Sequence, residues 1–414
     1  MLKSKPRLLA LAIAAAMAPS ALQAAVLEEV KVTATKRTES VQDVSIAITA
    51  FTGDQMEQLG WTNAQQVTAM APGVHTIQPN GEANYAIAMR GVASSDFTTN
   101  VESPVALYVD EVYISQMSGA GFMLFDMERV EILRGPQGTL FGRNATGGLI
   151  HYITKKPRSD FEGYITGTVG DNEHYKVEGA VGGGTDSLAF RFSGSYHNND
   201  GYVQNRFTGD DLNDADDQAY RMQVLWTPTD AVEFLVSYRH SEQDINTGFF
   251  EYVSSVESGK LTPGVPNPVL DGYTDNDGVV WAGDYDDPGF NDLQTDGLTG
   301  TLKWDFGGFR LTSITDKSEV ERDYIEDSDA SPLSFFNFFL TTDAEQFSQE
   351  IRLDGDTDWF QWVGGVYYLD LDINDSNGAI TDPFIGPVPT PGAEGGLNNP
   401  YSSELESYSV FGQL

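Results

Sequence analysis

Residues 130–150 read VEILRGPQGTLFGRNATGGLI, and this stretch decides the fold. Two apolar runs, Val130–Leu133 and Leu149–Thr154, predict strands, and the glycines between them permit tight turns and close backbone approach. A phosphate-binding loop is a competing interpretation of such a glycine-rich run. However, no Gly-Lys-Ser or Gly-Lys-Thr follows it, and the formal net charge of −37 opposes anions.

The residues around this stretch predict one small α+β domain over 38–158. Thr52 and Gln55 have the spacing of a helix capping box, and Ala64–Met70 predicts a short helix that Pro72-Gly73 ends. About 120 residues is an ordinary size for a single domain. Additional strands are predicted at Tyr85–Met89 and Val105–Val109.

Downstream of this domain, residues 159–414 alternate apolar and polar side chains with the period of two that strands require. One example is Leu188–Tyr196, where Leu188, Phe190 and Phe192 alternate with Arg191 and Ser193. A soluble β-sandwich is the alternative interpretation. The polar face carries whole charges, which are costly in a sandwich core but suit a water-filled lumen, so we expect a membrane β-barrel.

Connection lengths support the barrel. Tight turns are predicted at 182–186, 227–230, 307–308 and 354–358, and much longer connections at 198–217, 241–296, 318–345 and 371–404. Short periplasmic turns alternating with long extracellular loops are typical of outer-membrane barrels. The four long stretches carry 28 of the 37 net negative charges. They predict an acidic outer surface, which either attracts cationic cargo or simply solvates exposed loops.

The chain begins with the layout of a secretory signal peptide. Lys3, Lys5 and Arg7 precede the apolar run 8–17, and small residues follow to Ala24. The apolar run has about half the ~20 residues that a membrane helix needs, so a membrane helix is the weaker interpretation. Export and cleavage after Ala24 are the predicted outcome.

Composition excludes several other classes of function. The chain has no cysteine, so disulfides, zinc–thiolate sites and thiol nucleophiles are absent. With 24 basic and 61 acidic residues, it lacks the positive charge needed for binding nucleic acid. The five histidines show no His-Glu-x-x-His spacing and no Gly-x-Ser-x-Gly occurs, which argues against a hydrolase.

The run 130–150 resembles the plug domain of TonB-dependent outer-membrane receptors, as do Met89–Val92 and Tyr108–Tyr113. The resemblance implies a transmembrane antiparallel β-barrel of 22 strands, about ten of them present here, with a small α+β plug in its lumen. It divides the chain into a signal peptide at 1–24, a TonB box and tether at 25–37, a plug at 38–158 and part of the barrel at 159–414. We expect the chain to be an N-terminal fragment.

The same resemblance assigns roles to individual residues. TonB is expected to bind Glu28, Glu29, Val30, Lys31, Val32, Thr33 and Ala34 as an added strand. Arg90 and Arg134 of the plug are expected to pair with barrel carboxylates, Glu350 being the candidate, or alternatively to cap local strands. Cargo is expected to contact plug residues, with Gln78, Asn80, Ser95, Asp96 and Phe97 as candidates.

The function implied by the resemblance is active import without enzyme chemistry, cofactor or resident metal. The predicted cargo is a ferric siderophore or another iron complex. Haem, cobalamin or a glycan are alternatives, and a passive outer-membrane porin is a further one. The expected partners are TonB with its inner-membrane energising complex, outer-membrane lipid and the small-molecule cargo, but no nucleic acid.

Overall fold

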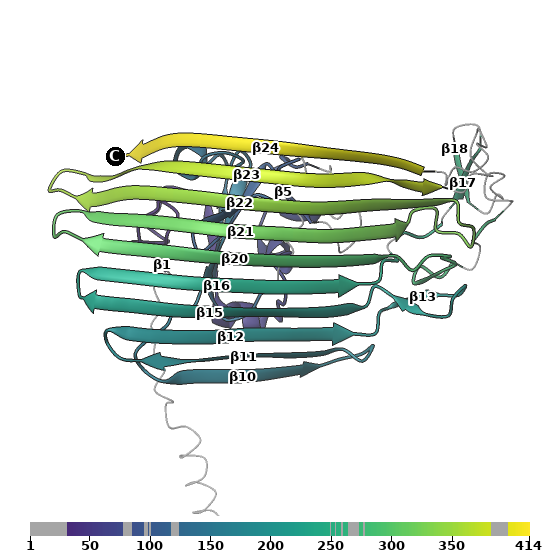
Figure 1. The fold of residues 1–414 in the computed structure, drawn as a ribbon, viewed down its shortest axis with the longest axis horizontal. Coiled ribbons are helices and arrows are strands. Elements are labelled where there is room, and N and C mark those ends of the chain that lie inside the picture. The colour runs from purple at the N-terminus through teal and green to yellow at the C-terminus, as the bar shows by residue number, and fades with distance from the viewer. Residues whose placement is uncertain are drawn as a thin grey trace, which may run out of the picture.

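The computed structural model describes residues 31–77, 85–94, 98, 101–116, 124–248, 250–252, 254–257, 260–263, 273–275, 278–381 and 396–414. The predicted signal peptide therefore lies outside the described residues. A broad sheet of long strands stands in front of a smaller domain, which packs against one face of the sheet (Figure 1). Within the described ranges, no helix is long and apolar enough to cross a membrane.

The broad sheet has ten strands, and each pairs antiparallel with its neighbours in chain order. This confirms the predicted set of about ten barrel strands. The strands are β10 (Glu162–Val169), β11 (Tyr175–Gly184), β12 (Leu188–Asn199), β15 (Ala215–Thr229), β16 (Val232–Ile245), β20 (Phe290–Asp305), β21 (Arg310–Asp327), β22 (Phe336–Asp356), β23 (Gln361–Thr381) and β24 (Gly396–Gln413).

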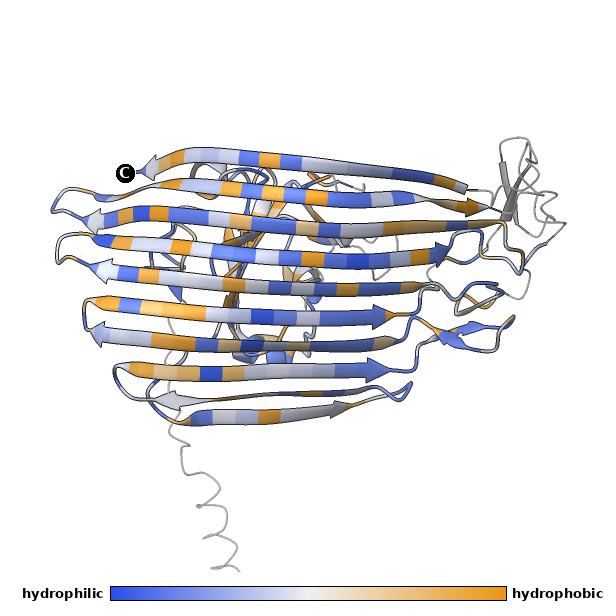
Figure 2. Ribbon diagram, viewed as in Figure 1, coloured by the Kyte–Doolittle hydropathy of each residue, from blue (hydrophilic) through white to orange (hydrophobic). Residues whose placement is uncertain are grey.

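Side chains alternate across this sheet as the sequence predicts. On β12, Phe190 and Phe192 are 52% and 44% exposed on the outer face, whereas Arg191 between them is 4% exposed against the smaller domain. The same alternation gives the orange and blue bands along the strands in Figure 2. The apolar face therefore points outward and the charged face inward, the reverse of a soluble sheet and the pattern of a membrane barrel.

Connections also alternate as predicted, although the strands are longer than expected. Short turns join the strands at one end of the sheet, and longer connections join them at the other (Figure 1). The long connection expected at 318–345 is wrong, because β21 and β22 continue until only 328–335 separates them. A membrane strand needs about 9–11 residues, so these strands of 18 and 21 residues project beyond the hydrocarbon layer. There both faces are polar, and the alternation that marks a strand disappears.

Aromatic side chains mark the edge of the apolar band beside the short turns. Trp304 stacks on Phe306 with ring centroids 4.7 Å apart, and Phe306 stacks on Phe309 at 4.8 Å. All three rings are between 41% and 47% exposed. Aromatic rings at this height are typical of the interface between membrane and water.

The smaller domain is built on a five-stranded sheet in the order β3, β8, β9, β6, β7. Strands β6 and β9 run parallel, and the other pairs are antiparallel. The bounds are β3 (Ile48–Thr52), β6 (Val105–Val109), β7 (Val112–Ile114), β8 (Met127–Arg134) and β9 (Gly148–Thr154). Strands β8 and β9 are the two arms of the glycine-rich run 130–150.

Short elements complete the domain. Helix α2 (Gly53–Gln58) begins with the predicted capping box, in which the Thr52 side chain accepts from the Gln55 backbone and the Gln55 side chain accepts from the Thr52 backbone. The predicted helix near 64–70 is a 3-10 helix, η1 (Gln66–Met70). The remaining elements are α3 (Gly138–Phe141) and the strands β4 (Val74–Ile77) and β5 (Ala86–Met89).

Small strands lie outside the two main sheets. At the N-terminal end of the described chain, β1 (Lys31–Val32) pairs with β2 (Glu39–Ser40). The longer connections contain β13 (Val203–Asn205), β14 (Asp211–Leu212), β17 (Ser254–Glu257), β18 (Lys260–Pro263) and β19 (Ala282–Gly283).

Candidate functional site

The tether that precedes the small domain is folded against it. Of the predicted TonB-binding segment, Glu28, Glu29 and Val30 lie outside the described residues. Lys31–Val32 form β1, while Val32 and Ala34 are fully buried. The backbone N–H of Thr33 donates to both carboxylate oxygens of Glu131, at 2.9 and 3.0 Å. The described part of this segment is therefore held by main-chain and side-chain bonds.

Lys36 anchors the tether to the inward face of the ten-stranded sheet, which we call the wall. Its Nζ lies 2.5 Å from Oε2 of Glu350 on β22, and both side chains are at most 6% exposed. The rings of Phe141 and Phe411 lie 5.1 and 5.3 Å from the same nitrogen. A buried ion pair flanked by aromatic faces satisfies the charge of Lys36 only while the tether stays in place.

The expected pairing of Glu350 with Arg90 and Arg134 is wrong. Glu350 is occupied by Lys36 and by Arg352, whose Nη1 donates to its Oε1 at 2.8 Å. Arg134 instead donates from Nη1 to the carbonyl oxygen of Pro72 at 3.2 Å, and Arg90 is exposed at a turn with φ of 52°. In the part of the chain that the structure describes, neither arginine forms an ion pair with a carboxylate. The physical reason is the position of Glu350 along β22, which places its side chain beside Lys36 of the tether and not beside either arginine.

Arg352 forms a second link between plug and wall. Its Nη1 lies 2.5 Å from Oε2 of Glu111, which follows β6 in the plug. Burial pushes the pKa of the Glu111 carboxyl upward, but the positive charges of Arg352 and Lys303, together with the hydrogen bond from Arg352, outweigh burial and hold the pKa well below its usual range. Glu111 is therefore charged near neutral pH, where the contact with Arg352 is an ion pair.

A third link joins the plug to β12 and β15. Arg191 holds the carboxylate of Asp126 in a two-pronged contact, with Nε–Oδ2 at 2.6 Å and Nη2–Oδ1 at 2.5 Å. Arg221 donates to the backbone oxygens of Phe125 and Asp126, and its guanidinium lies over the Phe125 ring at 4.8 Å. Bidentate pairs of this kind are strong and directional. They fix the start of β8 to the wall.

The sequence did not predict these pairs. It did, however, contain a signal for the arginine of each pair. Arg191 and Arg352 were recognisable as charges at inward positions of alternating strands. Their partners Asp126 and Glu111 lie in plug turns with φ of 51° and 71°, where no periodicity marks them.

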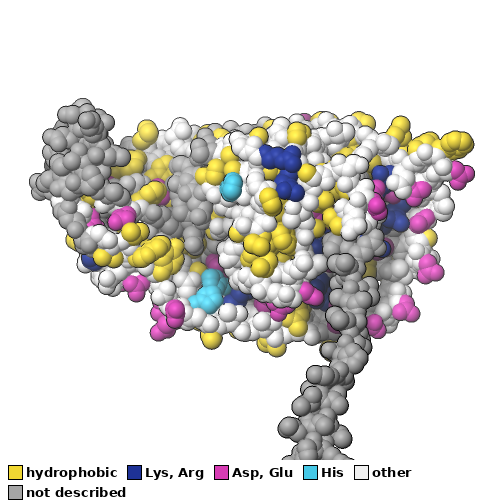
Figure 3. Space-filling model, turned by 180° about the vertical axis from the view of Figure 1, so that it is seen from behind, with side chains coloured by type: hydrophobic (Ala, Val, Ile, Leu, Met, Phe, Trp, Pro, Cys, Tyr) yellow, Lys and Arg dark blue, Asp and Glu magenta, His cyan; other side chains and the backbone are white. Residues whose placement is uncertain are grey.

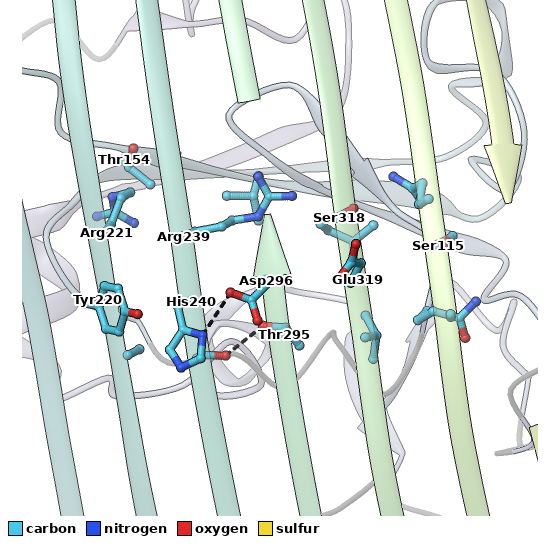
Figure 4. Close-up of a pocket in the computed structure, with 18 of the residues that line it drawn as sticks. Ser115, Thr154, Tyr220, Arg221, Arg239, His240, Thr295, Asp296, Ser318 and Glu319 are labelled. Atoms are coloured by element: carbon cyan, nitrogen blue, oxygen red, sulfur yellow. Dashed lines mark hydrogen bonds and ion pairs between the residues drawn. The ribbon is translucent and has the colours of Figure 1, made fainter. Parts of the chain in front are cut away.

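A cavity of about 860 Å³, counting its open mouth, lies between the plug and strands β15 to β23. Figure 4 shows Arg221 and Arg239 on neighbouring strands of its wall, with Thr154 of the plug near Arg221. Arg239 pairs with the fully buried Asp316 at 3.0 Å. Gln116 lines the same cavity, and both polar atoms of its buried side chain lack a partner among the described residues.

The five residues predicted to contact cargo belong to two segments of the plug. Gln78, Asn80, Ser95, Asp96 and Phe97 all lie outside the described residues. The flanks of the first segment are described: β4 ends at Ile77 and β5 begins at Ala86. The role of the five residues stays a prediction.

Comparison with known proteins gives the family. Residues 40–149, which contain β3, β6, β7 and β8 of the plug sheet and the start of β9, match the model of the TonB-dependent Receptor Plug Domain. The chain therefore carries the plug domain of the TonB-dependent receptor family. Members of this family are outer-membrane β-barrel transporters rather than enzymes, in agreement with the predicted location and fold.

Individual relatives place the rest of the chain. The pesticin receptor of Yersinia enterocolitica is 35% identical over 149 residues, covering 35% of this chain and 21% of that protein. The vitamin B12 transporter BtuB of Vibrio vulnificus is 26% identical over 274 residues, covering 63% of this chain and 41% of that protein. The solved ferric yersiniabactin uptake receptor FyuA of Yersinia pestis superposes with a TM-score of 0.69 at 19% identity, covering 89% of this chain.

This receptor chain spans only part of the length of the relatives it matches. The superposition on FyuA covers 61% of that chain, and the two sequence alignments cover less than half of each relative. The activity, cargo and partners of the whole receptor are therefore matters for proposal.

Proposed function

We propose that this receptor imports a scarce solute across the outer membrane in a TonB-dependent manner. The observation that carries the proposal is the plug with its tether, bound to the inward face of the ten-stranded sheet by three separate charged contacts. A lumen filled in this way does not conduct passively, which argues against the porin alternative. Opening a path then requires work on the plug, which an energised partner supplies.

The tether is suited to receive that work. Val32 and Ala34 belong to the same buried apolar cluster as Val363, which follows the short turn between β22 and β23, so the tether lies toward the short-turn end of the sheet. In the barrel orientation this end faces the periplasm. A short strand such as β1 can exchange its main-chain hydrogen bonds with β2 for those of a sheet edge of TonB, so these bonds are made in both states.

The cargo that we propose is a ferric siderophore or another iron complex. Support comes from the shared architecture with the ferric yersiniabactin uptake receptor. The relationship to the vitamin B12 transporter supports cobalamin as the second candidate. Both are bulky solutes that exceed the size limit of passive diffusion, and both need the plug to move.

Uptake by the full-length receptor tests the proposal. We expect cells that carry the receptor as their sole importer to accumulate radiolabelled ferric siderophore, and to lose accumulation when residues 28–34 are deleted. Binding of the solute at the cell surface should persist in the deletion variant, which shows that the barrel is folded. A second arm with labelled cobalamin separates the two cargo classes. Energised uptake that is unchanged by the deletion would refute TonB coupling.

A further inference from the structure

A polar cleft lies between the plug and the wall at the end of the sheet with the long connections. It measures about 1100 Å³, counting its open mouth. The plug contributes Asn63 and Gln66, and strands β12 and β15 contribute His197 and Asp217. His174, in the connection between β10 and β11, lies at its edge. Figure 3 shows histidine side chains gathered beside acidic and basic groups on the face opposite to that of Figure 1.

Three side chains of this cleft form a hydrogen-bonded chain. Oδ2 of Asp217 lies 3.0 Å from Nδ1 of His197, and Nε2 of His197 lies 3.2 Å from Nδ1 of His174. A carboxylate only accepts, so His197 donates from Nδ1. When both rings are neutral, Nε2 of His197 accepts from Nδ1 of His174. The Nε2 atom of His174 is then left as a bare acceptor.

The ionisation of His174 supports this arrangement. Burial, the neighbouring His197 and the charge of Lys176 all lower the pKa of His174 below its ordinary value. The ring is therefore neutral near pH 7. Nε2 of His174 consequently keeps its lone pair.

Asp217 supplies a second unused acceptor. The residue is 7% exposed, and its Oδ1 has no hydrogen-bond partner among the described residues. A buried carboxylate oxygen without a donor carries a desolvation cost that a bound ligand removes. It is the strongest indication that the cleft is built to receive a group with hydrogen-bond donors.

The plug side of the cleft offers donors. The Gln66 side-chain oxygen already accepts from the backbone N–H groups of Thr62 and Asn63, so its NH₂ group is what it presents to a ligand. The Asn63 oxygen likewise accepts from the Gln66 backbone. Acceptors on the wall thus face amide donors on the plug, the combination that a hydroxyl group satisfies, because it donates one hydrogen and accepts others.

Other ligand classes fit less well. An anion would meet the unpaired oxygen of Asp217. An ammonium group donates only, and would leave the amide donors of Asn63 and Gln66 unused. A resident metal ion has no support either, since no group of three His, Cys, Asp or Glu side chains in the described ranges is arranged to hold one.

We propose that this cleft, defined by His174, His197, Asp217, Asn63 and Gln66, binds an uncharged, hydroxyl-rich, sugar-like part of the imported solute. The proposal rests on the import function proposed above and adds the chemistry of the solute. Asp217 and His174 accept hydrogen bonds from its hydroxyls, and the plug amides donate to them. Because the cleft is shared by plug and wall, a bound solute contacts the part of the receptor that moves.

Three trisaccharides of different charge test the proposal on the purified full-length receptor by isothermal titration calorimetry. They are neutral maltotriose, the cationic trimer of glucosamine and the anionic trimer of galacturonic acid. We expect maltotriose to bind at least about tenfold more tightly than either charged trimer. Equal binding of all three, or preferential binding of a charged trimer, would overturn the proposal.

Two variants locate the binding in this cleft. Asp217→Asn keeps the shape but removes the charged acceptor and should weaken maltotriose binding about tenfold to a hundredfold. His174→Leu, which changes a connection rather than a strand, should weaken it as well and remains informative if Asp217→Asn does not fold. The matched control is Asp216→Asn, because Asp216 is the next residue of β15 and is exposed on the opposite face. Unchanged affinity in both cleft variants would refute the site.

This experiment is separate from the test of import. Sugar binding requires no TonB, so a receptor that does not bind the neutral sugar in this cleft leaves the uptake result intact. Conversely, uptake that is unaffected by deletion of 28–34 would refute coupling without touching the cleft.

Discussion

The backbone conformation of Lys36 determines a contact between the tether and the ten-stranded sheet. Its φ of 58° lies in the left-handed region, which a lysine adopts at a cost of about 1–2 kcal/mol. That conformation directs the side chain away from the tether into a buried contact with Glu350. The local strain persists because the ion pair and the two flanking aromatic rings hold it.

The Lys36–Glu350 ion pair should therefore hold the tether against the ten-stranded sheet. Lys36→Met leaves the Glu350 carboxylate buried with one partner fewer, and loss of one member of a buried pair costs about 3–5 kcal/mol. We expect faster hydrogen exchange at backbone amides 32–36 of the full-length receptor, measured by mass spectrometry. Glu350→Met should have a similar effect.

The double variant Lys36→Met with Glu350→Met separates pairing from burial. Because both charges are gone, exchange should return most of the way toward the wild-type rate. Lys31→Met is the control, since Lys31 carries the same charge on the exposed side of β1. Equal exchange in Lys36→Met and Lys31→Met would show that the ion pair does not hold the tether.

For single residues, the sequence identified inward-facing charged positions better than it identified the residues that pair with them. Glu350 was chosen as an inward carboxylate because it alternates with apolar residues on a strand, and it is buried in the structure. Its partner was not predictable, since Lys36 precedes it by 314 positions and sits in a two-strand tether without periodicity. Long-range pairing depends on where the plug rests against the wall, and no local pattern encodes that placement.

For whole elements too, the sequence predicted less than the structure shows, as the glycine-rich run of the plug illustrates. Its flanking strands β8 and β9 were predicted, because apolar runs next to glycines are strong local signals. The reason for each glycine is visible only in the fold. A Cβ atom at Gly148 would lie 2.1 Å from Sδ of Met89 and 2.3 Å from the carbonyl oxygen of Leu133, so β9 packs there only without a side chain.

Gly148→Ala should accordingly loosen the plug sheet. The clash involves backbone as well as side chain, and the φ of +148° adds strain, so we expect a loss of about 1–3 kcal/mol. The readout is hydrogen exchange of the β9 amides in the full-length receptor. Gly138→Ala is the matched control, because Gly138 opens α3 without a positive φ and a methyl group added there would meet no described atom within 4 Å. If Gly138→Ala loosens β9 as much as Gly148→Ala, close packing is not the cause.

Within the ten-stranded sheet, the sequence underestimated the length of the strands where both sheet faces meet water. The apolar band is marked by exposed side chains such as Met222, Val224 and Trp226, and the sequence identified these strands. Beyond the band, outward positions become acidic: Asp296 pairs across the strands with Glu319, and Glu319 with Glu345. Lys317 forms ion pairs with both Glu319 and Glu345, and salt screens the remaining repulsion between these like charges. Local sequence therefore resembles a loop while backbone pairing continues.

The two edges of the ten-stranded sheet determine whether these strands can be stable in a membrane by themselves. Among the residues that the structure describes, strands β10 and β24 each pair with a neighbour on one side only. Their apolar side chains show this: Ile165 and Val410 are 81% and 84% exposed, against 52% for Phe190 on an inner strand. In hydrocarbon each unpaired backbone group costs several kcal/mol, so two edges of several groups cost tens of kcal/mol, more than the ~5–15 kcal/mol that stabilises a typical fold.

The 414-residue chain expressed by itself should therefore not insert into a membrane as a folded monomer. We expect it to be degraded or to aggregate in the periplasm, and to be cut by protease within β23 and β24 when added to lipid vesicles. The full-length receptor, treated in parallel, should protect the same strands because their edges are paired. A monomer of this chain that resists protease in vesicles and migrates as a compact species in unheated gels would contradict the argument, since the edges would then be satisfied within these ten strands alone.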